Sequence, residues 1–350
     1  MKSNIFSTVR LLGSGHELQK SDSNIVSKTL KTLLAIIALA TTILSCSKDD
    51  DAPTPVAPEK TVYIAGFEKI TGKQYATLWK NGVATKLTDG TKIAEAVKVV
   101  VSGSDVYVLG KDGTDYKVWK NGTPLYTLVS CTIAEGLYIS GNDVYVSGNY
   151  DNFAKYWKNN TQENISDGVY PCRARDIILV NNIVHIVGEE IKSIAIRIAK
   201  LWKRSSPSAS IDLSPADKVG SATNISNIGN TTYISGREDG FGKIWKDESN
   251  SFTTPNTGTL YSVFCSGADV YALGVGFETY GIQIYKNKNS SALPDNFEGN
   301  SIFVSESDVY VLGLFVNGAD DQPAISKNGT VTKYGDISGN VKMNSLFVVK

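Results

Sequence analysis

The chain repeats one pattern of apolar and polar positions seven times between residue 61 and its last residues. Each copy begins with a short apolar strand that ends in glycine, continues through a loop, and closes on a strand that ends in an aromatic residue followed by lysine. Clear copies are Asp105–Gly110 leading to Val118–Gly122, and Asp143–Gly148 leading to Tyr156–Lys158. Self-similarity at a fixed period of roughly 20 to 50 residues is typical of repeat architectures. The repeat therefore governs the interpretation of every local motif.

Two columns of the repeat define its length. The glycine column is complete and consists of Gly66, Gly110, Gly148, Gly188, Gly236, Gly274 and Gly313. The aromatic column holds all five tryptophans and consists of Trp79, Trp119, Trp157, Trp202, Trp245, Tyr285 and Ser326, each followed by lysine. Successive members of the aromatic column are 38 to 45 residues apart, which is the length of four short antiparallel strands and their turns.

Turn residues divide each period into four strands. The turn between the first and second strands reads Ser-Gly-Ser-Asp, Ser-Gly-Asn-Asp or Ser-Gly-Ala-Asp, and three turns between the third and fourth strands contain Asn-Gly. These residues tolerate the positive φ angles of type I′ hairpins. The second strands are apolar at consecutive positions, as expected when neighbouring sheets cover both faces. The sequence therefore predicts an all-β fold, a seven-bladed β-propeller with four-stranded antiparallel blades.

The two ends of the repeat region predict how the ring closes. Ser345–Val349 matches the first strand of a blade, yet no second strand follows it. Thr61–Gly66 is a second strand with no first strand before it. We expect the C-terminal strand to pair with the first N-terminal strand, which closes the ring and removes open sheet edges.

The region before the repeats has the features of an export signal. The apolar run Leu33–Leu44 follows Lys28 and Lys31 and is shorter than the roughly 20 residues of a membrane span. Ile43–Cys46 resembles a bacterial lipobox, which implies that Cys46 is lipidated; an ordinary signal peptide that contains a cysteine is the alternative. We assign residues 1–45 to a signal peptide of the lipoprotein type, 46–60 to an acidic, proline-rich tether, and 61–350 to the propeller. A misplaced start codon would explain the long polar segment 1–27.

The repeats, with their Asp-Val-Tyr-Val-x-Gly and Trp-Lys-Asn-Gly motifs, resemble those of propeller-forming lipoproteins of Bacteroidetes-type bacteria over residues 61–350. They lack the Gly-His to Trp-Asp pairing of WD40 repeats and the double glycine of kelch repeats. The acidic run Ser47–Asp51 resembles the signal that exports such lipoproteins to the outer face of the outer membrane, although such a run is also common in solvated linkers. The resemblance implies a cell-surface protein held to the membrane by its N-terminal lipid.

The charge of the chain limits the classes of partner that it can bind, and its cysteines indicate where a disulfide could form. Residues 1–45 contain five basic and two acidic residues, so the rest of the chain has 30 Lys and Arg against 33 Asp and Glu. A chain with this charge balance has no excess of basic residues to form a surface that binds a phosphate backbone, so we expect no nucleic-acid partner. We also expect the propeller to be monomeric. Cys131 and Cys172 lie one period apart, so a disulfide between adjacent blades is one possibility and two free thiols the other. Cys265 is expected to be a small buried residue.

Chemistry-bearing residues mostly fall in repeat columns. His185 is the only histidine after the signal segment and stands where six copies have tyrosine, so we interpret it as a core residue. This argues against a Ser-His-Asp triad or an imidazole metal site, and we predict neither a metal nor a cofactor. The lysine column either pairs with the aspartates that begin the second strands or forms a ring of cations for an anionic polymer; we favour pairing.

The segments that differ between copies are candidates for binding, because loops on a rigid scaffold commonly carry it. We expect the variable loops between the second and third strands, and those that precede the first strands, to share one rim of the ring. The candidate binding residues there are Tyr75, Tyr116, Phe153, Arg173, Arg175, Phe241, Phe277 and Tyr280. The primary hypothesis is a non-enzymatic module that binds a glycan or a protein. A glycoside hydrolase or lyase that uses loop carboxylates, and a structural envelope protein, are the alternatives.

Overall fold

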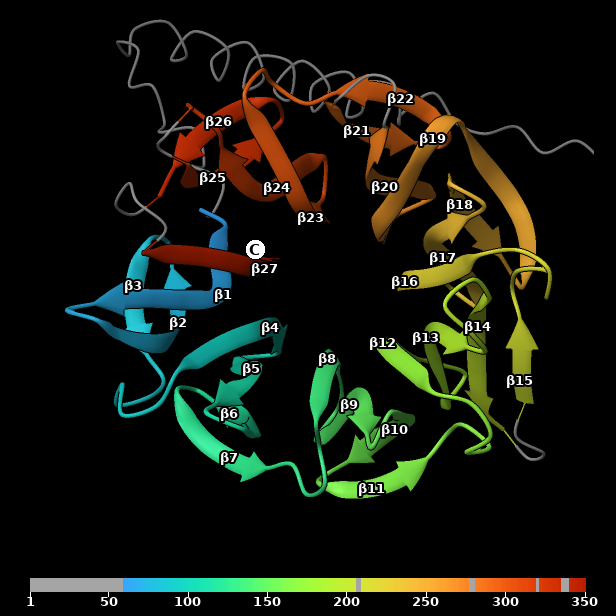
Figure 1. The fold of residues 1–350 in the computed structure, drawn as a ribbon. Helices are drawn as coiled ribbons and strands as arrows, with labels where there is room; N and C mark the ends of the chain where they lie inside the picture. The colour runs from blue at the N-terminus through green and yellow to red at the C-terminus, as the bar shows by residue number, and fades with distance from the viewer. Residues whose placement is uncertain (1–58, 206–208, 277–280, 319–320, 335–339) are drawn as a thin grey trace, which may run out of the picture. The chain divides into compact units, whose positions relative to one another are not determined.

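The repeat region folds into a closed ring of β-sheets. The computed structural model describes residues 59–205, 209–276, 281–318, 321–334 and 340–350, which contain 27 strands. The chain divides into two units, Met1–Ala57 and Pro58–Lys350, and all the strands belong to the second. Figure 1 shows these strands grouped into seven blades around a common centre, which confirms the predicted seven-bladed β-propeller. The described residues contain no helix whose length and hydropathy would let it cross a membrane.

Each blade is an antiparallel sheet whose strands follow one another from the centre to the outside. Blade 1 contains β27 (Val341–Val349), β1 (Thr61–Ile70), β2 (Lys73–Lys80) and β3 (Val83–Lys86). Blade 2 contains β4 (Ala94–Ser102), β5 (Asp105–Asp112), β6 (Asp115–Lys120) and β7 (Thr123–Thr127). Blade 3 contains β8 (Ile133–Ser140), β9 (Asp143–Tyr150), β10 (Phe153–Lys158) and β11 (Thr161–Asn164). Blade 4 contains β12 (Cys172–Val180), β13 (Ile183–Ile191), β14 (Arg197–Arg204) and β15 (Ala209–Asp212).

The remaining three blades follow the same order, except that one long strand serves two of them. Blade 5 contains β16 (Gly220–Ile228), β17 (Thr231–Glu238), β18 (Phe241–Lys246) and the first part of β19 (Ser249–Ser266). Blade 6 contains the second part of β19, β20 (Asp269–Gly276), β21 (Gly281–Lys286) and β22 (Asn289–Ala292). Blade 7 contains β23 (Phe297–Ser305), β24 (Asp308–Phe315), β25 (Gln322–Lys327) and β26 (Thr330–Lys333).

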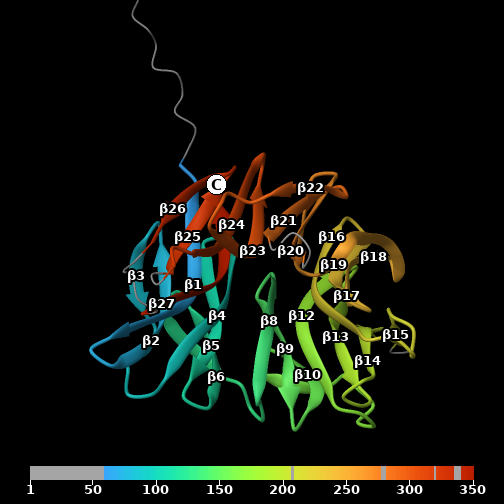
Figure 2. The ribbon, with the colours of Figure 1, turned by 45° about the horizontal axis from the view of Figure 1, so that its top comes forward.

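The ring closes as the sequence predicts. The C-terminal strand β27 pairs antiparallel with β1, so that Phe347 lies opposite Tyr63. Lys60, just before β1, reaches blade 7, where its ammonium lies 3.2 Å from Asp308 and donates a 2.7 Å hydrogen bond to the carbonyl of Ser305. Both ends of the ring are therefore fixed to neighbouring blades. Figure 2 shows the inner strands β4, β8 and β12 standing next to one another.

Every inner strand contains a β-bulge at the same register position. The extra residue follows the one that faces the glycine column, and the seven bulged residues are Val97, Glu135, Arg175, Thr223, Tyr261, Asn300 and Asn344. A Cβ atom on any glycine of the column would lie only 1.8 to 2.3 Å from a backbone carbonyl oxygen of the inner strand. The complete glycine column therefore exists because the bulged strand approaches the second strand too closely for a side chain.

The Asp, Lys and Asn of the repeat motif form one network at the opposite end of the blades. In blade 3, Lys158 lies 2.8 Å from Asp143, and Asn159 donates a 2.7 Å hydrogen bond to the same carboxylate. Asn159 also accepts a 2.9 Å hydrogen bond from the backbone N–H of Val144. Lys158 and Asn159 hold the pKa of Asp143 below its usual range. Blades 2, 6 and 7 repeat the ion pair at 2.8 to 3.0 Å, which confirms that the lysine column pairs with these aspartates.

The core consists of apolar clusters between adjacent blades. All five tryptophans are at most 4% exposed, and each packs on the preceding blade, as Trp119 does on Ala65 and Ala76. His185 is 5% exposed and its Nδ1 lies 2.9 Å from the carbonyl oxygen of Ile183, in keeping with its interpretation as a core residue. Burial lowers the pKa of His185. The three cysteines at 131, 172 and 265 are free thiols, so no disulfide joins blades 3 and 4.

Candidate functional site

The hairpins between the second and third strands are shorter than the sequence suggested. We expected variable loops there, but in blades 1, 2, 3 and 5 the two strands continue to a two-residue turn, as at Asp151–Asn152. Tyr75 and Phe153 consequently lie within strands, half-buried, and the ammonium of Lys86 lies 4.2 Å from the centre of the Tyr75 ring. Phe241 likewise begins β18. Phe277, Tyr280 and Cys46 lie outside the described residues.

A single pocket brings together three of the residues expected at the rim. It has a volume of about 520 Å³, lies where the inner strands begin, and receives residues from all seven blades, including Tyr116, Arg173 and Arg175. All seven bulged residues line it. Tyr75, Phe153 and Phe241 do not line this pocket. The inner strands therefore supply most of the site, and the hairpins contribute only Lys111 and Tyr116.

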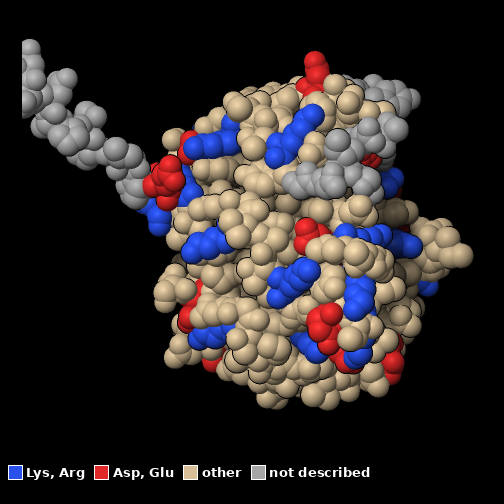
Figure 3. All heavy atoms as spheres, turned by 90° about the vertical axis from the view of Figure 1, so that its left-hand side faces the viewer, with Lys and Arg blue, Asp and Glu red and all other residues tan. Residues whose placement is uncertain are grey.

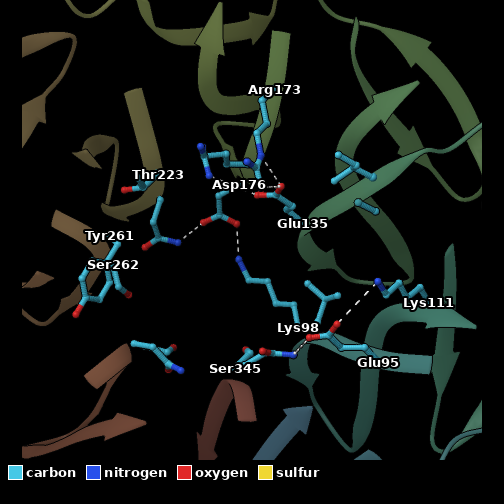
Figure 4. A pocket seen from close by; sticks show the side chains of 18 of the residues that line it. Glu95, Lys98, Lys111, Glu135, Arg173, Asp176, Thr223, Tyr261, Ser262 and Ser345 are labelled. Carbon is cyan, nitrogen blue, oxygen red and sulfur yellow. Dashed lines mark hydrogen bonds and ion pairs between the residues drawn. The ribbon is translucent and has the colours of Figure 1, made fainter. Parts of the chain in front are cut away.

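Two arginines and a glutamate form the charged group contributed by blades 3 and 4. Arg173 donates a 2.7 Å hydrogen bond through Nε to Glu135, and a terminal nitrogen of Arg175 lies 3.9 Å from the other oxygen of the same carboxylate. Arg175 also donates a 2.8 Å hydrogen bond to Glu189, whose side chain is only 3% exposed. The buried Glu189 thus fixes the side chain of Arg175. Arg173 is 42% exposed, and Figure 4 shows its side chain directed toward Glu135.

An ion pair crosses the pocket between blades that are not neighbours. Lys98 in blade 2 contacts Asp176 in blade 4, and Asn224 in blade 5 also donates to Asp176 (Figure 4). The intervening blade has Gly136 at the equivalent position after its bulge. A Cβ atom on Gly136 would lie 2.9 Å from the Cα of Asp176, so glycine permits the close approach of blade 4. The absence of a side chain there leaves Lys98 a path across blade 3.

A third charged group contains Glu95 in blade 2. Its carboxylate lies 3.1 Å from Lys342 and 4.0 Å from Lys111, and it accepts a 2.8 Å hydrogen bond from Asn344. Asn344 also donates a 2.9 Å hydrogen bond to the carbonyl of Ala96. This group ties the closing strand β27 to blade 2 and keeps both lysines at the edge of the pocket.

The remaining wall is neutral and joins adjacent blades by hydrogen bonds. Thr223 donates to the carbonyl of Leu260 at 2.8 Å, and Asn224 accepts from the N–H of Val263 at 2.8 Å. The hydroxyl of Tyr261 donates to the carbonyl of Gly299 at 2.5 Å, and burial raises its pKa. Burial likewise raises the pKa of Tyr116. These side chains are fixed by the scaffold and present amide, hydroxyl and ring surfaces to the pocket.

The pocket carries more positive than negative side chains. Arg173, Arg175, Lys98, Lys111 and Lys342 line it together with three carboxylates, Glu95, Glu135 and Asp176. No group of three or more histidine, cysteine or acidic side chains suited to a metal occurs among the described residues. The outer face of blade 1 differs from the pocket, because Figure 3 shows basic and acidic side chains interspersed there without a continuous patch of either sign.

Comparison with known proteins identifies the fold. No protein-family model matches the sequence, and no curated protein matches it either. Among solved structures, a prolyl endopeptidase matches with a TM-score of 0.53 and 10% identity over 80% of this chain and 50% of that chain. A quinoprotein alcohol dehydrogenase-like protein of Bacteroides thetaiotaomicron matches with a TM-score of 0.50 and 13% identity over 81% of this chain and 77% of that chain. This chain thus spans half the length of the prolyl endopeptidase, and identities this low show a shared propeller fold alone.

Proposed function

We propose that the protein is a lipid-anchored, non-enzymatic binding module at the cell surface, and that its ligand is a glycan with acidic groups. The observation that carries the proposal is the pocket at the start of the inner strands, where seven bulges bring side chains from every blade into one polar site. Bulges commonly redirect side chains next to functional sites. A rigid ring that presents prearranged polar groups binds with little ordering cost.

The chemistry of the pocket favours a sugar that carries carboxylate or sulfate. A volume of about 520 Å³ lies within the range of small-molecule sites. Arginine recognises planar carboxylates through its fork of donors, while Lys111 and Lys342 add point charges. Tyr116 and Tyr261 offer ring surface, and the neutral wall offers hydroxyl and amide groups for sugar hydroxyls.

The proposal predicts that substitutions in the pocket weaken binding selectively. Arg173→Gln is expected to reduce the affinity for acidic oligosaccharides by about 10-fold or more, because a charge-assisted hydrogen bond is worth roughly 1.5 to 3 kcal/mol. Neutral oligosaccharides of the same length are expected to bind more weakly to the unsubstituted protein. The measurement is isothermal titration calorimetry against a panel of uronate-containing, sulfated and neutral oligosaccharides.

Phe153→Ala and Phe241→Ala are the matched controls, because both residues lie outside the pocket. Each is expected to leave affinity unchanged. If the two phenylalanine variants lost binding while Arg173→Gln kept it, the ligand would occupy the hairpin rim and the pocket assignment would be wrong.

A carbohydrate-active enzyme is the second candidate, because Glu95, Glu135 and Asp176 share one pocket with arginines and tyrosines. A glycosidase needs two carboxylates that flank the bond to be cleaved. Here every carboxylate contacts a cation, and Asp176 also accepts from Asn224, which favours a binding role. Release of reducing ends or unsaturated sugars from the same oligosaccharides, lost in Glu135→Gln, would decide for the enzyme. A pocket of this kind gives no support to a purely structural envelope role.

The anchor is tested independently of the ligand. Cys46→Ala is expected to abolish incorporation of a labelled fatty acid and to release the protein from the membrane fraction, because the thioether-linked lipid can form only on the cysteine. Cys131→Ala, at a described free thiol within the ring, is the matched control and is expected to keep the label. Protease treatment of intact cells measures surface exposure; full protection would contradict display on the outer face.

A further inference from the structure

A second cavity lies between blades 5 and 6, at the opposite end of the strands from the polar pocket. It has a volume of about 260 Å³ and includes Ala268, in the turn that follows the inner strand β19. Tyr233, Phe252 and Tyr285 give it an aromatic lining, and the rings of Phe252 and Tyr285 lie 5.4 Å apart at 57°. Lys246 and Lys288 also line it. The cavity therefore combines an aromatic interior with two cations.

The cavity adjoins a departure from the aromatic column. Tyr285 stands where five blades place a tryptophan that fills the space against the preceding blade. Tyr285 is 6% exposed and packs on Ile244 of blade 5, but its single ring is smaller than an indole. Tyr285 therefore borders an open cavity, as Trp202 of blade 4 also does, but the cavity at Trp202 has no other aromatic residue in its lining.

A second departure leaves the column lysine of blade 5 without an aspartate. Blades 2, 3, 6 and 7 pair this lysine with the aspartate that begins the second strand, but β17 begins with Thr231. Lys246 lies over the ring of Tyr233, 5.8 Å from its centre, and no described carboxylate lies within ion-pair distance of it. The acidic residues that follow it are engaged elsewhere, because Asp247 accepts from the N–H of Thr232 and Glu248 pairs with Lys203.

A third departure adds a lysine in the turn after the third strand. Lys288 has a φ of 77° in the turn position where blades 1, 2 and 7 have glycine, and Asn160 of blade 3 and Glu248 of blade 5 have similar angles of 67° and 74°. The feature particular to this turn is therefore the cation that it places beside the cavity. Three features thus meet at one cavity: a smaller ring in the aromatic column, a column lysine that lies over a tyrosine ring, as Lys80 does in blade 1, and an added cation in the turn.

We infer that the cavity between blades 5 and 6 is a second ligand site, which takes a planar aromatic ring carrying a carboxylate. The ring stacks among Phe252, Tyr285 and Tyr233, where aromatic edges and faces pack favourably. The carboxylate lies at the mouth beside Lys246 and Lys288. This site is separate from the polar pocket and from any glycan bound there.

The test uses indole-3-acetate as the probe and the full chain as the protein, with isothermal titration calorimetry as the measurement. Indole-3-acetamide and cyclohexylacetate remove the charge and the aromatic ring separately. Each is expected to bind roughly two- to fivefold more weakly, because one exposed ion pair or one aromatic contact contributes about 0.5 to 1 kcal/mol. Tyr285→Trp restores the repeat residue, fills the cavity and is expected to abolish binding while the unfolding temperature is kept.

Two further variants separate the site from its surroundings. Lys246→Gln, at an exposed position, is expected to lower the affinity for indole-3-acetate to the affinity that the unsubstituted protein has for indole-3-acetamide. Lys80→Gln changes the equivalent lysine of blade 1, beside Trp79, and is expected to leave binding unchanged, as is Arg173→Gln in the polar pocket. The inference is overturned if indole-3-acetate shows no saturable binding at millimolar concentration, if the amide binds as tightly, or if Tyr285→Trp retains binding.

Discussion

Gly188→Ala is expected to lower the midpoint of thermal unfolding by roughly 6 to 12 °C, measured by circular dichroism. The new Cβ would lie 1.8 Å from the carbonyl oxygen of Arg173, a backbone atom in the bulged strand that cannot rotate away. Overpacking of this kind costs about 3 kcal/mol, and in a domain of this size each kcal/mol corresponds to roughly 2 to 4 °C. Relief of the clash requires β12 to move, which displaces Arg173 and Arg175. The variant is therefore also expected to lose ligand affinity below its unfolding temperature.

Gly122→Ala is the matched control for this prediction. Gly122 has a φ of 81° and nothing lies within 4 Å of its added Cβ, so the substitution introduces backbone strain without a steric clash. That strain costs about 1 kcal/mol, or roughly 2 to 4 °C. Equal losses in the two variants would show that the glycine column is not held by contact with the bulged strand, and the structural explanation of the column would have to be abandoned.

The sequence predicted the ring because the repeat is local. Each hairpin joins strands only a few residues apart, so turn residues and the glycine column suffice to place the strands in order. The closure of the ring could be predicted for the same reason, since Thr61–Gly66 and Ser345–Val349 are complementary fragments of one blade. The ion pairs between the Asp and Lys columns could also be predicted, because both residues lie a fixed number of positions from the turns of each blade.

The polar pocket could not be predicted in the same way, because bulges alter the direction of side chains. One extra residue shifts the alternation of a strand, so the position of Arg175 or Tyr261 relative to the centre depends on pairing that the sequence does not show. The Lys98–Asp176 contact joins residues 78 positions apart in blades that are not neighbours. A usable signal was present: the first halves of inner strands such as β12 and β16 carry polar and charged residues, among them Asp176 and Asn224.

Variation between copies also proved informative at positions other than the hairpins. We expected differences to matter in the loops, but the hairpins of blades 1, 2, 3 and 5 are tight. The informative differences lie within the strands, where Gly136 after the bulge of blade 3 leaves space for Lys98, and Tyr285 in the aromatic column borders a cavity. Residues that most of the repeats share are those that a blade requires for folding. A departure from them indicates that another structural or functional constraint acts at that position.

Removal of residues 341–350 is expected to prevent the ring from folding as a soluble monomer. The strand β27 buries Val341, Met343, Leu346 and Val348, each at most 7% exposed. Burial of such side chains stabilises a fold by about 1.5 to 3 kcal/mol each, and the sum is comparable to the net stability of about 5 to 15 kcal/mol of a typical domain. Deletion also exposes β1 as an inner sheet edge, which favours aggregation. Size-exclusion chromatography and circular dichroism measure the loss of monomer and of cooperative unfolding.

A peptide with the sequence of residues 340–350 provides the decisive control, because an exposed sheet edge accepts a strand from another chain. Added in excess during refolding, it is expected to restore a soluble complex with a cooperative transition. The same peptide with Leu346→Asp and Val348→Asp retains the backbone donors and acceptors but places charges in the interface with blade 7, and it is expected not to rescue. A truncated chain that unfolds cooperatively within a few degrees of the full chain, without any peptide, would show that the ring is held by its other six blades and that β27 is dispensable.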